Sequence, residues 1–217
     1  MQICNDQLAK LLKSISSIDE TISLTMSIFK ENRLIYNTMY LVSISCSSGF
    51  CFPLYCLFFL FAKDSSLGEN SSSNLIFYHL VTAEFIQLSI IVPVRYLIRR
   101  PRPVIEPPSI FSKQSKFFSK RFGLYHFLKL YNLIGRWNQY SFPSLHASRA
   151  FLLCIIIYNG LAIYNMNGII YLFPLLVASI TVSFSRLVLQ RHFLSDVITG
   201  AMVGITSSFA TLKYCFL

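Results

Sequence analysis

The chain has 217 residues, of which 54% are hydrophobic and only 13% are charged. Soluble domains carry about 25% charged residues, so this composition excludes an ordinary soluble domain and predicts a single integral membrane domain over residues 1–217. The formal net charge is +10, from 19 Lys and Arg against 9 Asp and Glu. The basic residues gather near the ends of apolar runs, which favours anionic lipids or a phosphorylated substrate and argues against a nucleic-acid partner.

Residues 1–35 form the first predicted element, an amphipathic N-terminal segment. Apolar side chains such as Leu11 and Ile15 recur at helical spacing among charged ones such as Lys13 and Asp19. This pattern is typical of a helix that lies in the membrane interface. The segment is short of apolar length for a span, so the sequence leaves two alternatives open, an interfacial helix or a sixth span.

Five longer apolar runs follow in the chain. The hydrocarbon core of a bilayer is about 30 Å thick, so a spanning helix needs roughly 20 apolar residues. The runs that meet this requirement are 36–62, 75–98, 144–164, 169–190 and 193–216. The predicted fold is therefore all-α, a polytopic membrane helical bundle with five strong spans.

Alternation of these runs across the bilayer brings four of their ends to one side. They are the end of 75–98, the start of 144–164, the end of 169–190 and the start of 193–216. The loop over residues 99–143, which is strongly basic, lies on the same side. Long loops in compact proteins are often functional, so this side is where we expect a site.

Three polar clusters lie at those four ends, and each has basic or hydroxyl side chains at fixed spacing. In chain order they are RYLIRRPRP (95–103), PSLH (143–146) and SRLVLQRHFLSD (185–196). Arginine forks match phosphate oxygens, so Arg95, Arg102 and Arg186 can close around one phosphate. Pro143 and Ser144 open a helix, so we expect its free N–H groups and the Ser144 hydroxyl to point at that phosphate.

His192 and Asp196 stand four residues apart and therefore share a helix face. The carboxylate can hold one imidazole nitrogen as N–H and leave the other free to attack phosphorus. His146 can protonate the leaving alcohol, since an unperturbed imidazole has a pKa of about 6.5. The sequence offers no carboxylate cluster to hold a metal ion, so we expect neither a metal nor another cofactor.

Together the three clusters resemble the signature of the type 2 phosphatidic acid phosphatase superfamily. That signature is a basic residue, six others and RP; then PSGH; then SR, five others, H, three others and D. The resemblance implies a metal-independent hydrolase in which His192 forms a phosphohistidine, Asp196 orients it and His146 is the general acid. It also implies a phosphorylated membrane lipid as the partner and a phosphate site, whose residues here are Arg95, Arg102, Ser144, Leu145 and Arg186.

The chain departs from the signature at two positions. Arg95 stands where Lys is usual, which keeps the charge. Leu145 stands where Gly is usual, and glycine there allows close approach to phosphate or a positive φ. The leucine keeps one alternative open, a weak or inactive relative that binds or moves phospholipids. A lipid phosphotransferase, which passes the phosphoryl group to an alcohol other than water, is a further alternative. The sequence does not choose the lipid or the oligomeric state.

Several other polar residues near the runs have structural interpretations. We interpret Arg99 and Arg100 as membrane-interface anchors. Arg191 either helps the pocket or faces the headgroups. Glu84 is too deep for phosphate chemistry, and we expect it to pair with His79 or Gln87.

The side of the membrane on which the site lies is the last sequence-based expectation. The resemblance implies a site that faces the periplasm or lumen, whereas most basic residues gather on the site side, which the positive-inside rule taken alone would place in the cytoplasm. The long loop is a weak topological signal, and a sixth span within residues 7–30 would move Lys10 and Lys13 across. We therefore expect an outward-facing site.

Overall fold

The structure is a computed structural model, and it describes residues 2–47, 51, 55, 72–103, 139–163 and 168–214. These residues form helices and contain no strand, so the all-α prediction is confirmed for the part of the chain described. The helices are α1 (Gln2–Glu31), α2 (Arg33–Ser45), α4 (Ser72–Ile98), α7 (Leu145–Ile163), α8 (Gly168–Val188) and α9 (Leu194–Tyr214).

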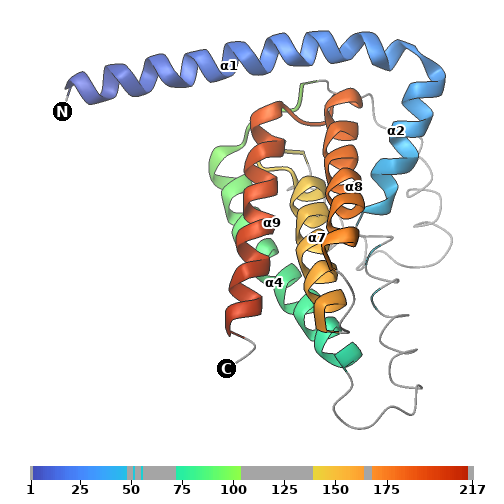
Figure 1. Ribbon diagram of the computed structural model, residues 1–217. Helices are drawn as coiled ribbons and strands as arrows, with labels where there is room; N and C mark the ends of the chain where they lie inside the picture. The colour runs from blue at the N-terminus through green and yellow to red at the C-terminus, as the bar shows by residue number, and fades with distance from the viewer. Residues whose placement is uncertain are drawn as a thin grey trace, which may run out of the picture.

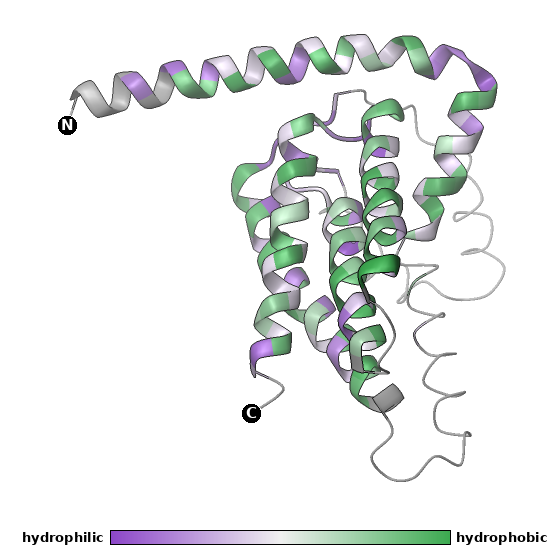
Figure 2. Ribbon diagram, viewed as in Figure 1, coloured by the Kyte–Doolittle hydropathy of each residue, from purple (hydrophilic) through white to green (hydrophobic). Residues whose placement is uncertain are grey.

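Helices α4, α7, α8 and α9 lie side by side as a bundle, with α2 along one flank (Figure 1). Three of them contain stretches long and apolar enough to cross a membrane, at Leu75–Ile98, Leu145–Ala162 and Ile169–Val188, and Figure 2 shows these stretches as mostly hydrophobic. The protein is therefore an integral membrane protein. The expected five spans are not reached among the described residues, because α9 carries many Gly, Ser and Thr residues and much of the second half of the run 36–62 lies outside them.

Small residues bring α9 into backbone contact with α7. A methyl group placed on Gly200 would overlap the carbonyl oxygen of Ser144, and one on Gly204 would overlap that of Ser148. Helices in membranes associate by this kind of close approach, since lipid provides no hydrophobic drive between them. The Gly200–Gly204 spacing thus fixes the start of α9 against the start of α7, where two of the three clusters lie.

A second link holds α4 against α7 inside the bundle. Arg149 donates its Nε to Glu84 at 2.8 Å, and Gln87 joins the Glu84 carboxylate to the hydroxyl of Ser148. The expected pairing of Glu84 with Gln87 is confirmed, and the sequence analysis missed Arg149. Ionisable groups at such depth stay charged only when paired, so this network fixes the register of the two helices.

The chain turns sharply between α1 and α2 at Asn32. Its side chain accepts hydrogen bonds from the N–H groups of Leu34 and Ile35 and so caps α2. As a result α1 lies across the end of the bundle and extends past it toward the N-terminus (Figure 1). This helix is not among those of the described residues that are long and apolar enough to cross a membrane, and its place in the membrane interface stays a prediction.

Candidate active site

The three polar clusters meet at the end of the bundle that α1 crosses. Backbone hydrogen bonds join them: Ser141 donates its N–H to the carbonyl of Arg100 at 2.9 Å, and Ser144 donates its N–H to the carbonyl of Asp196 at 2.9 Å. The predicted convergence of the run ends on one side is therefore confirmed. It follows from the alternation of the helices, with the α7–α9 contact setting the spacing.

Arg95 lies near the end of α4 and is 2% exposed. Its Nε and Nη2 both donate to the carbonyl oxygen of Pro143, at 3.1 and 2.8 Å. A guanidinium has five N–H donors, so this fork fixes the loop before α7 with only part of the donor set. Arg95 thus ties the first cluster to the second.

Ser144 and Leu145 form the start of α7. The carbonyl of Ser144 accepts the N–H of Ser148, so Ser144 caps the helix and Leu145 is the first helical residue. The N–H of Ser144 itself is bound to the Asp196 carbonyl and so is not one of the free N–H groups expected at this helix start. The Ser144 hydroxyl is fully buried and has no hydrogen-bond partner among the described residues, and the N–H groups of the first turn of α7 remain without helical acceptors.

Leu145 is buried, and its backbone has an ordinary conformation. Among the described residues the non-glycine positions with positive φ are Arg99 and Gln190. The position therefore does not require the conformational freedom of glycine. What the leucine changes at this site is space, through its buried side chain.

His192 lies in the turn between α8 and α9, where its side chain is 1% exposed. Its Nδ1 is 2.7 Å from the carbonyl oxygen of Ser141 and 3.7 Å from Oδ2 of Asp196. A carbonyl can only accept, so Nδ1 carries the proton and Nε2 has the lone pair. The sequence analysis expected the Asp196 carboxylate to hold this N–H, whereas in the structure the hydrogen bond goes to Ser141 and Asp196 lies beyond hydrogen-bond distance.

Burial and neighbouring charge act on His192 in the same direction. Burial, followed by the positive charges of Arg186, Arg102 and Arg95, holds the pKa of His192 well below its usual value, and the bond to Ser141 opposes the shift only in part. The imidazole is therefore neutral at physiological pH. A neutral ring with Nε2 unprotonated is the form that can act as a nucleophile.

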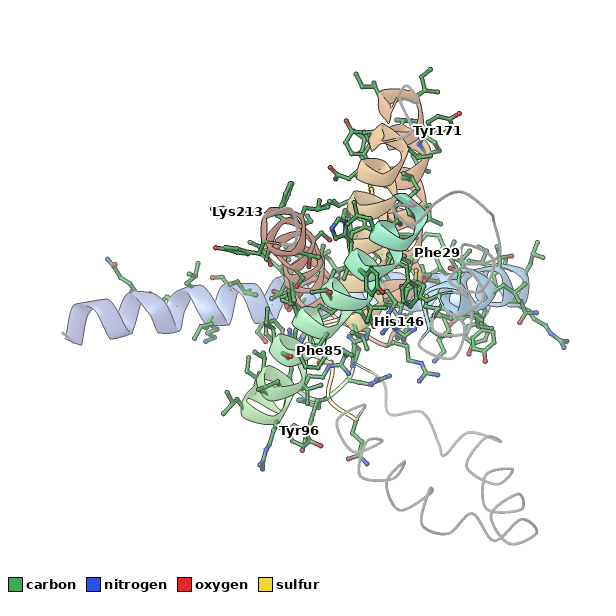
Figure 3. The ribbon with its side chains drawn as sticks, turned by 90° about the horizontal axis from the view of Figure 1, so that it is seen from below. Phe29, Phe85, Tyr96, His146, Tyr171 and Lys213 are labelled. Atoms are coloured by element: carbon green, nitrogen blue, oxygen red, sulfur yellow. The ribbon has the colours of Figure 1, made fainter. Side chains whose placement is uncertain are left out.

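A pocket of about 220 Å³ opens beside this turn. All three clusters contribute to its lining: Arg102 comes from the first, His146 from the second, and Arg186, Leu189 and Arg191 from the third. The other described lining residues form a wall from α2 and the turn after it, and the residues of this α2 wall are Tyr36, Tyr40, Ser43, Ile44 and Ser47. Figure 3 places His146 in the middle of the molecule, whereas Tyr96 and Tyr171 lie toward its outside.

The described part of the lining carries a strong positive charge, because it contains three arginines and no acidic residue. Arg186 also donates Nη1 to the hydroxyl of Ser43, which ties the wall to the third cluster. Among the residues that the structure describes, no group of three His, Cys, Asp or Glu side chains is placed to hold a metal ion. The donors at this pocket suit an anion such as phosphate.

A family model described as the PAP2 superfamily matches residues 75–216, which is more than half of the chain. The protein belongs to the PAP2 superfamily. All three clusters fall within the matched segment, so the resemblance seen in the sequence is confirmed. The chain is a membrane phosphatase by family.

Two crystal structures of membrane PAP2 proteins share the fold. One is the first transmembrane PAP2 type phosphatidylglycerolphosphate phosphatase from Bacillus subtilis, with a TM-score of 0.65 and 19% identity, over 93% of this chain and 86% of that one. The other is Aquifex aeolicus LpxE, with a TM-score of 0.57 and 18% identity, over 88% of this chain and 93% of that one. At identities this low, the similarity to these two structures shows a shared fold and nothing further.

The PAP2 site contains residues that the sequence analysis missed or placed elsewhere. Arg100 is not a membrane anchor, because its guanidinium binds Asp196 at 2.8 Å and Asp19 of α1 at 2.7 Å. The acceptor for His192, Ser141, was not assigned, and neither was the α2 wall. Only the position of Arg100 inside the first cluster could have drawn attention to it.

Proposed function

We propose that the protein hydrolyses a phosphate monoester or diphosphate on a membrane lipid through a phosphohistidine at His192, without a metal ion. The observation that carries this proposal is the pocket, where Arg102, His146 and Arg186 converge from three separate clusters. Family membership supports phosphate-ester hydrolysis. The placement of the site at the end of apolar helices supports a lipid substrate, since a headgroup could reach it from the bilayer surface.

In the first step Nε2 of His192 attacks phosphorus, and the bond between phosphorus and the lipid oxygen breaks. The leaving oxygen takes a proton from His146, so a lipid alcohol departs (or a lipid monophosphate when the substrate is a diphosphate). Arg102 and Arg186 balance the charge on the phosphoryl oxygens, which is where most of the rate enhancement arises in such transfers. Ser144, Leu145 and Arg95 complete the phosphate site.

In the second step water attacks the phosphohistidine. His146, now neutral, takes a proton from that water, the P–N bond breaks, and inorganic phosphate leaves. His192 returns to the neutral form with Nδ1–H on Ser141. Asp196, 3.7 Å from Nδ1, supplies the negative charge that steadies the ring while it carries the phosphoryl group.

The test is phosphate release by the purified protein from four lipids: phosphatidate, phosphatidylglycerol phosphate, a polyprenyl diphosphate and lipid A phosphate. We expect turnover of at least one in EDTA, inhibition by vanadate, and loss of nearly all activity in His192→Ala. Arg99→Gln is the control, because Arg99 is an exposed arginine of the first cluster. Activity that needs added Mg²⁺, or that persists in His192→Ala, would contradict the proposal.

Leu145 favours a second candidate, a weak or inactive relative that binds or moves phospholipids. Its buried side chain lies at the start of α7, where the family signature has glycine. A wild-type protein that hydrolyses none of the four lipids but binds them would support this candidate. A third, a lipid phosphotransferase, predicts that an added alcohol receives the phosphate in place of water.

We also propose that the site faces the periplasm or lumen, as the family resemblance suggests, and that α9 and the run 36–62 complete five spans. The basic residues of α1 lie on the site side, so the positive-inside rule opposes this orientation. The test of this orientation places a cysteine at Gln139, which is exposed beside the site, in a background without the native cysteines. Labelling of intact cells by an impermeant maleimide is expected, and labelling only after permeabilisation would overturn the orientation.

A further inference from the structure

Asp19 is an unusual residue of α1, because the helix buries a carboxylate and leaves its apolar neighbours in the open. Asp19 is 2% exposed, whereas Ile15 and Ile18 are 39% and 55% exposed. Aspartate is almost never fully buried unless it is paired. The contact between this part of α1 and the bundle is therefore polar and specific.

The partners of Asp19 all belong to the end of the bundle that holds the site. One carboxylate oxygen accepts the N–H of Ser195 at 3.0 Å, and the other accepts the Ser195 hydroxyl at 2.5 Å and Nη2 of Arg100 at 2.7 Å. Gln190 adds a bond from the turn before α9 to the carbonyl of Ser23, one helical turn further along α1. Residues 19 and 23 thus lie on the face of α1 that contacts the bundle, and Met26 packs against the bundle further along the same helix.

Arg100 connects Asp19 to both groups that lie beside Nδ1 of His192. Its Nη1 donates to Oδ1 of Asp196 at 2.8 Å. Its own carbonyl accepts the N–H of Ser141, whose carbonyl in turn accepts from His192 at 2.7 Å. The side chain of Arg100 therefore holds Asp196, and its main chain holds Ser141.

We propose that Asp19, through Arg100, is a positioning residue for His192, so that the N-terminal helix is a working part of the active site. This inference rests on the proposed function. Without the Asp19 charge, Arg100 has one carboxylate in place of two and its guanidinium is free to tilt toward Asp196. Both the Asp196 carboxylate and the 100–101 backbone then shift, and the imidazole loses its fixed orientation.

The test compares Asp19→Asn with Glu20→Gln, a neighbouring acid that is exposed on the same helix. Asp19→Asn is expected to lower kcat roughly tenfold or more on the best lipid substrate, with KM within about twofold, because small misplacements of reacting groups can cost about a hundredfold. Glu20→Gln is expected to change neither. Equal kinetics in the wild type and Asp19→Asn would overturn the proposal.

A second readout does not depend on turnover. In ¹⁵N-histidine spectra without substrate, assigned with His192→Gln, the wild type should show His192 as the neutral Nδ1–H tautomer, and Asp19→Asn should show a shifted or mixed signal. A purely structural role would lower the melting temperature and leave this signal unchanged in the folded fraction, which would overturn the proposal. A wild type inactive on every lipid would count against the phosphatase, while this signal would still decide the role of Asp19.

Arg100→Lys keeps the experiment decisive if Asp19→Asn does not fold. A lysine keeps the charge but presents a single nitrogen, which cannot fork between two carboxylates as a guanidinium does. The same loss of kcat and the same change in the His192 signal are expected. An unchanged signal and rate in Arg100→Lys would overturn the proposal.

Discussion

At the scale of single residues, the main finding is that His192 is held by a backbone carbonyl. The hydrogen bond from Nδ1 goes to Ser141, and Asp196 lies 3.7 Å from the same nitrogen. The carbonyl carries no charge and therefore selects the tautomer without protonating the ring. Asp196 divides its oxygens between Arg100 and the N–H of Phe193, so its carboxylate is fixed before substrate binds.

The depressed pKa of His192 predicts a pH dependence of stability. The unfolded ring takes up a proton near pH 6.5, and the folded ring does so only at lower pH, so the unfolded state binds more protons between the two values. The contribution to stability is fully present above about pH 6.5 and is lost as the pH falls toward the folded pKa. We expect the melting temperature in detergent, measured between pH 5 and 8, to fall more steeply with decreasing pH for the wild type than for His192→Gln. If the two proteins showed the same dependence on pH, the lowered pKa of His192 would be contradicted.

Leu145 permits a second prediction at this scale. Because its φ is ordinary, any benefit of glycine here would come from space. Leu145→Gly should raise kcat or widen the range of lipids hydrolysed, and should lower stability by about 2–5 kcal/mol as a buried side chain is lost. Leu145→Ala is the matched control, since it removes the side chain without freeing the backbone, and it should give the same gain in kcat.

An unchanged kcat in both Leu145 variants would show that the leucine does not crowd the phosphate. An inactive wild type that either variant activates would support the weak or inactive relative as the natural state of this chain.

At the scale of helices, the contact between α7 and α9 controls the site. The Gly200 and Gly204 contacts place Ser144 against Asp196, and the bond between their backbones spans the first turn of each helix. The Glu84–Arg149 pair does the same for α4 and α7. Together the two contacts fix the positions of Arg95, His146 and His192 relative to one another.

Gly204→Ala is therefore expected to destabilise the bundle. Its methyl group would overlap a backbone oxygen of α7, which cannot move without its helix, and overpacking of this kind costs about 1–3 kcal/mol. Gly160→Ala is the control, because its methyl group would meet the flexible end of Ile76 at 2.8 Å. Melting in detergent should drop by several degrees for Gly204→Ala and by much less for Gly160→Ala, and equal drops would show that backbone contact is not what matters.

At the scale of the whole molecule, the helical class and the convergence of the three clusters could be predicted from the sequence, whereas the phosphate-binding set stays a prediction. These depend on apolar run length and on motif spacing, both of which are local. The role of Asp19 could not be predicted, because a charged residue on an amphipathic helix ordinarily faces water. Its burial depends on where the Asn32 turn places α1, and that is decided by packing.

The role of Arg100 could not be predicted either, because it also depends on long-range packing. A basic residue at the end of an apolar run is usually an interface anchor, and only the approach of two carboxylates from distant segments changes its role. The wall of the pocket was missed because Tyr36 and Tyr40 occur in a run that reads as an ordinary span. Long-range contacts decide all three cases.

The origin of the pocket lining has a consequence for how relatives can diverge. The side chains proposed to react lie within residues 75–216, the segment that matches the family, whereas half of the described lining residues come from α2 and the turn after it, which precede that segment. We therefore expect the α2 wall to be able to change while the proposed reacting residues stay the same. Lipid preference can drift in the N-terminal part while the reaction stays the same.

Exchange of residues 1–47 for the equivalent segment of a PAP2 relative with a different lipid substrate tests this separation. The chimera should take on the donor's substrate preference, measured as the ratio of kcat/KM on the two lipids, and it should keep vanadate inhibition and dependence on His192. Donors with a carboxylate at the position of Asp19 should give faster chimeras than donors without one. A chimera that keeps its original preference would locate recognition in the catalytic segment, and a new lipid specificity would then have to arise among the same residues that carry out the reaction.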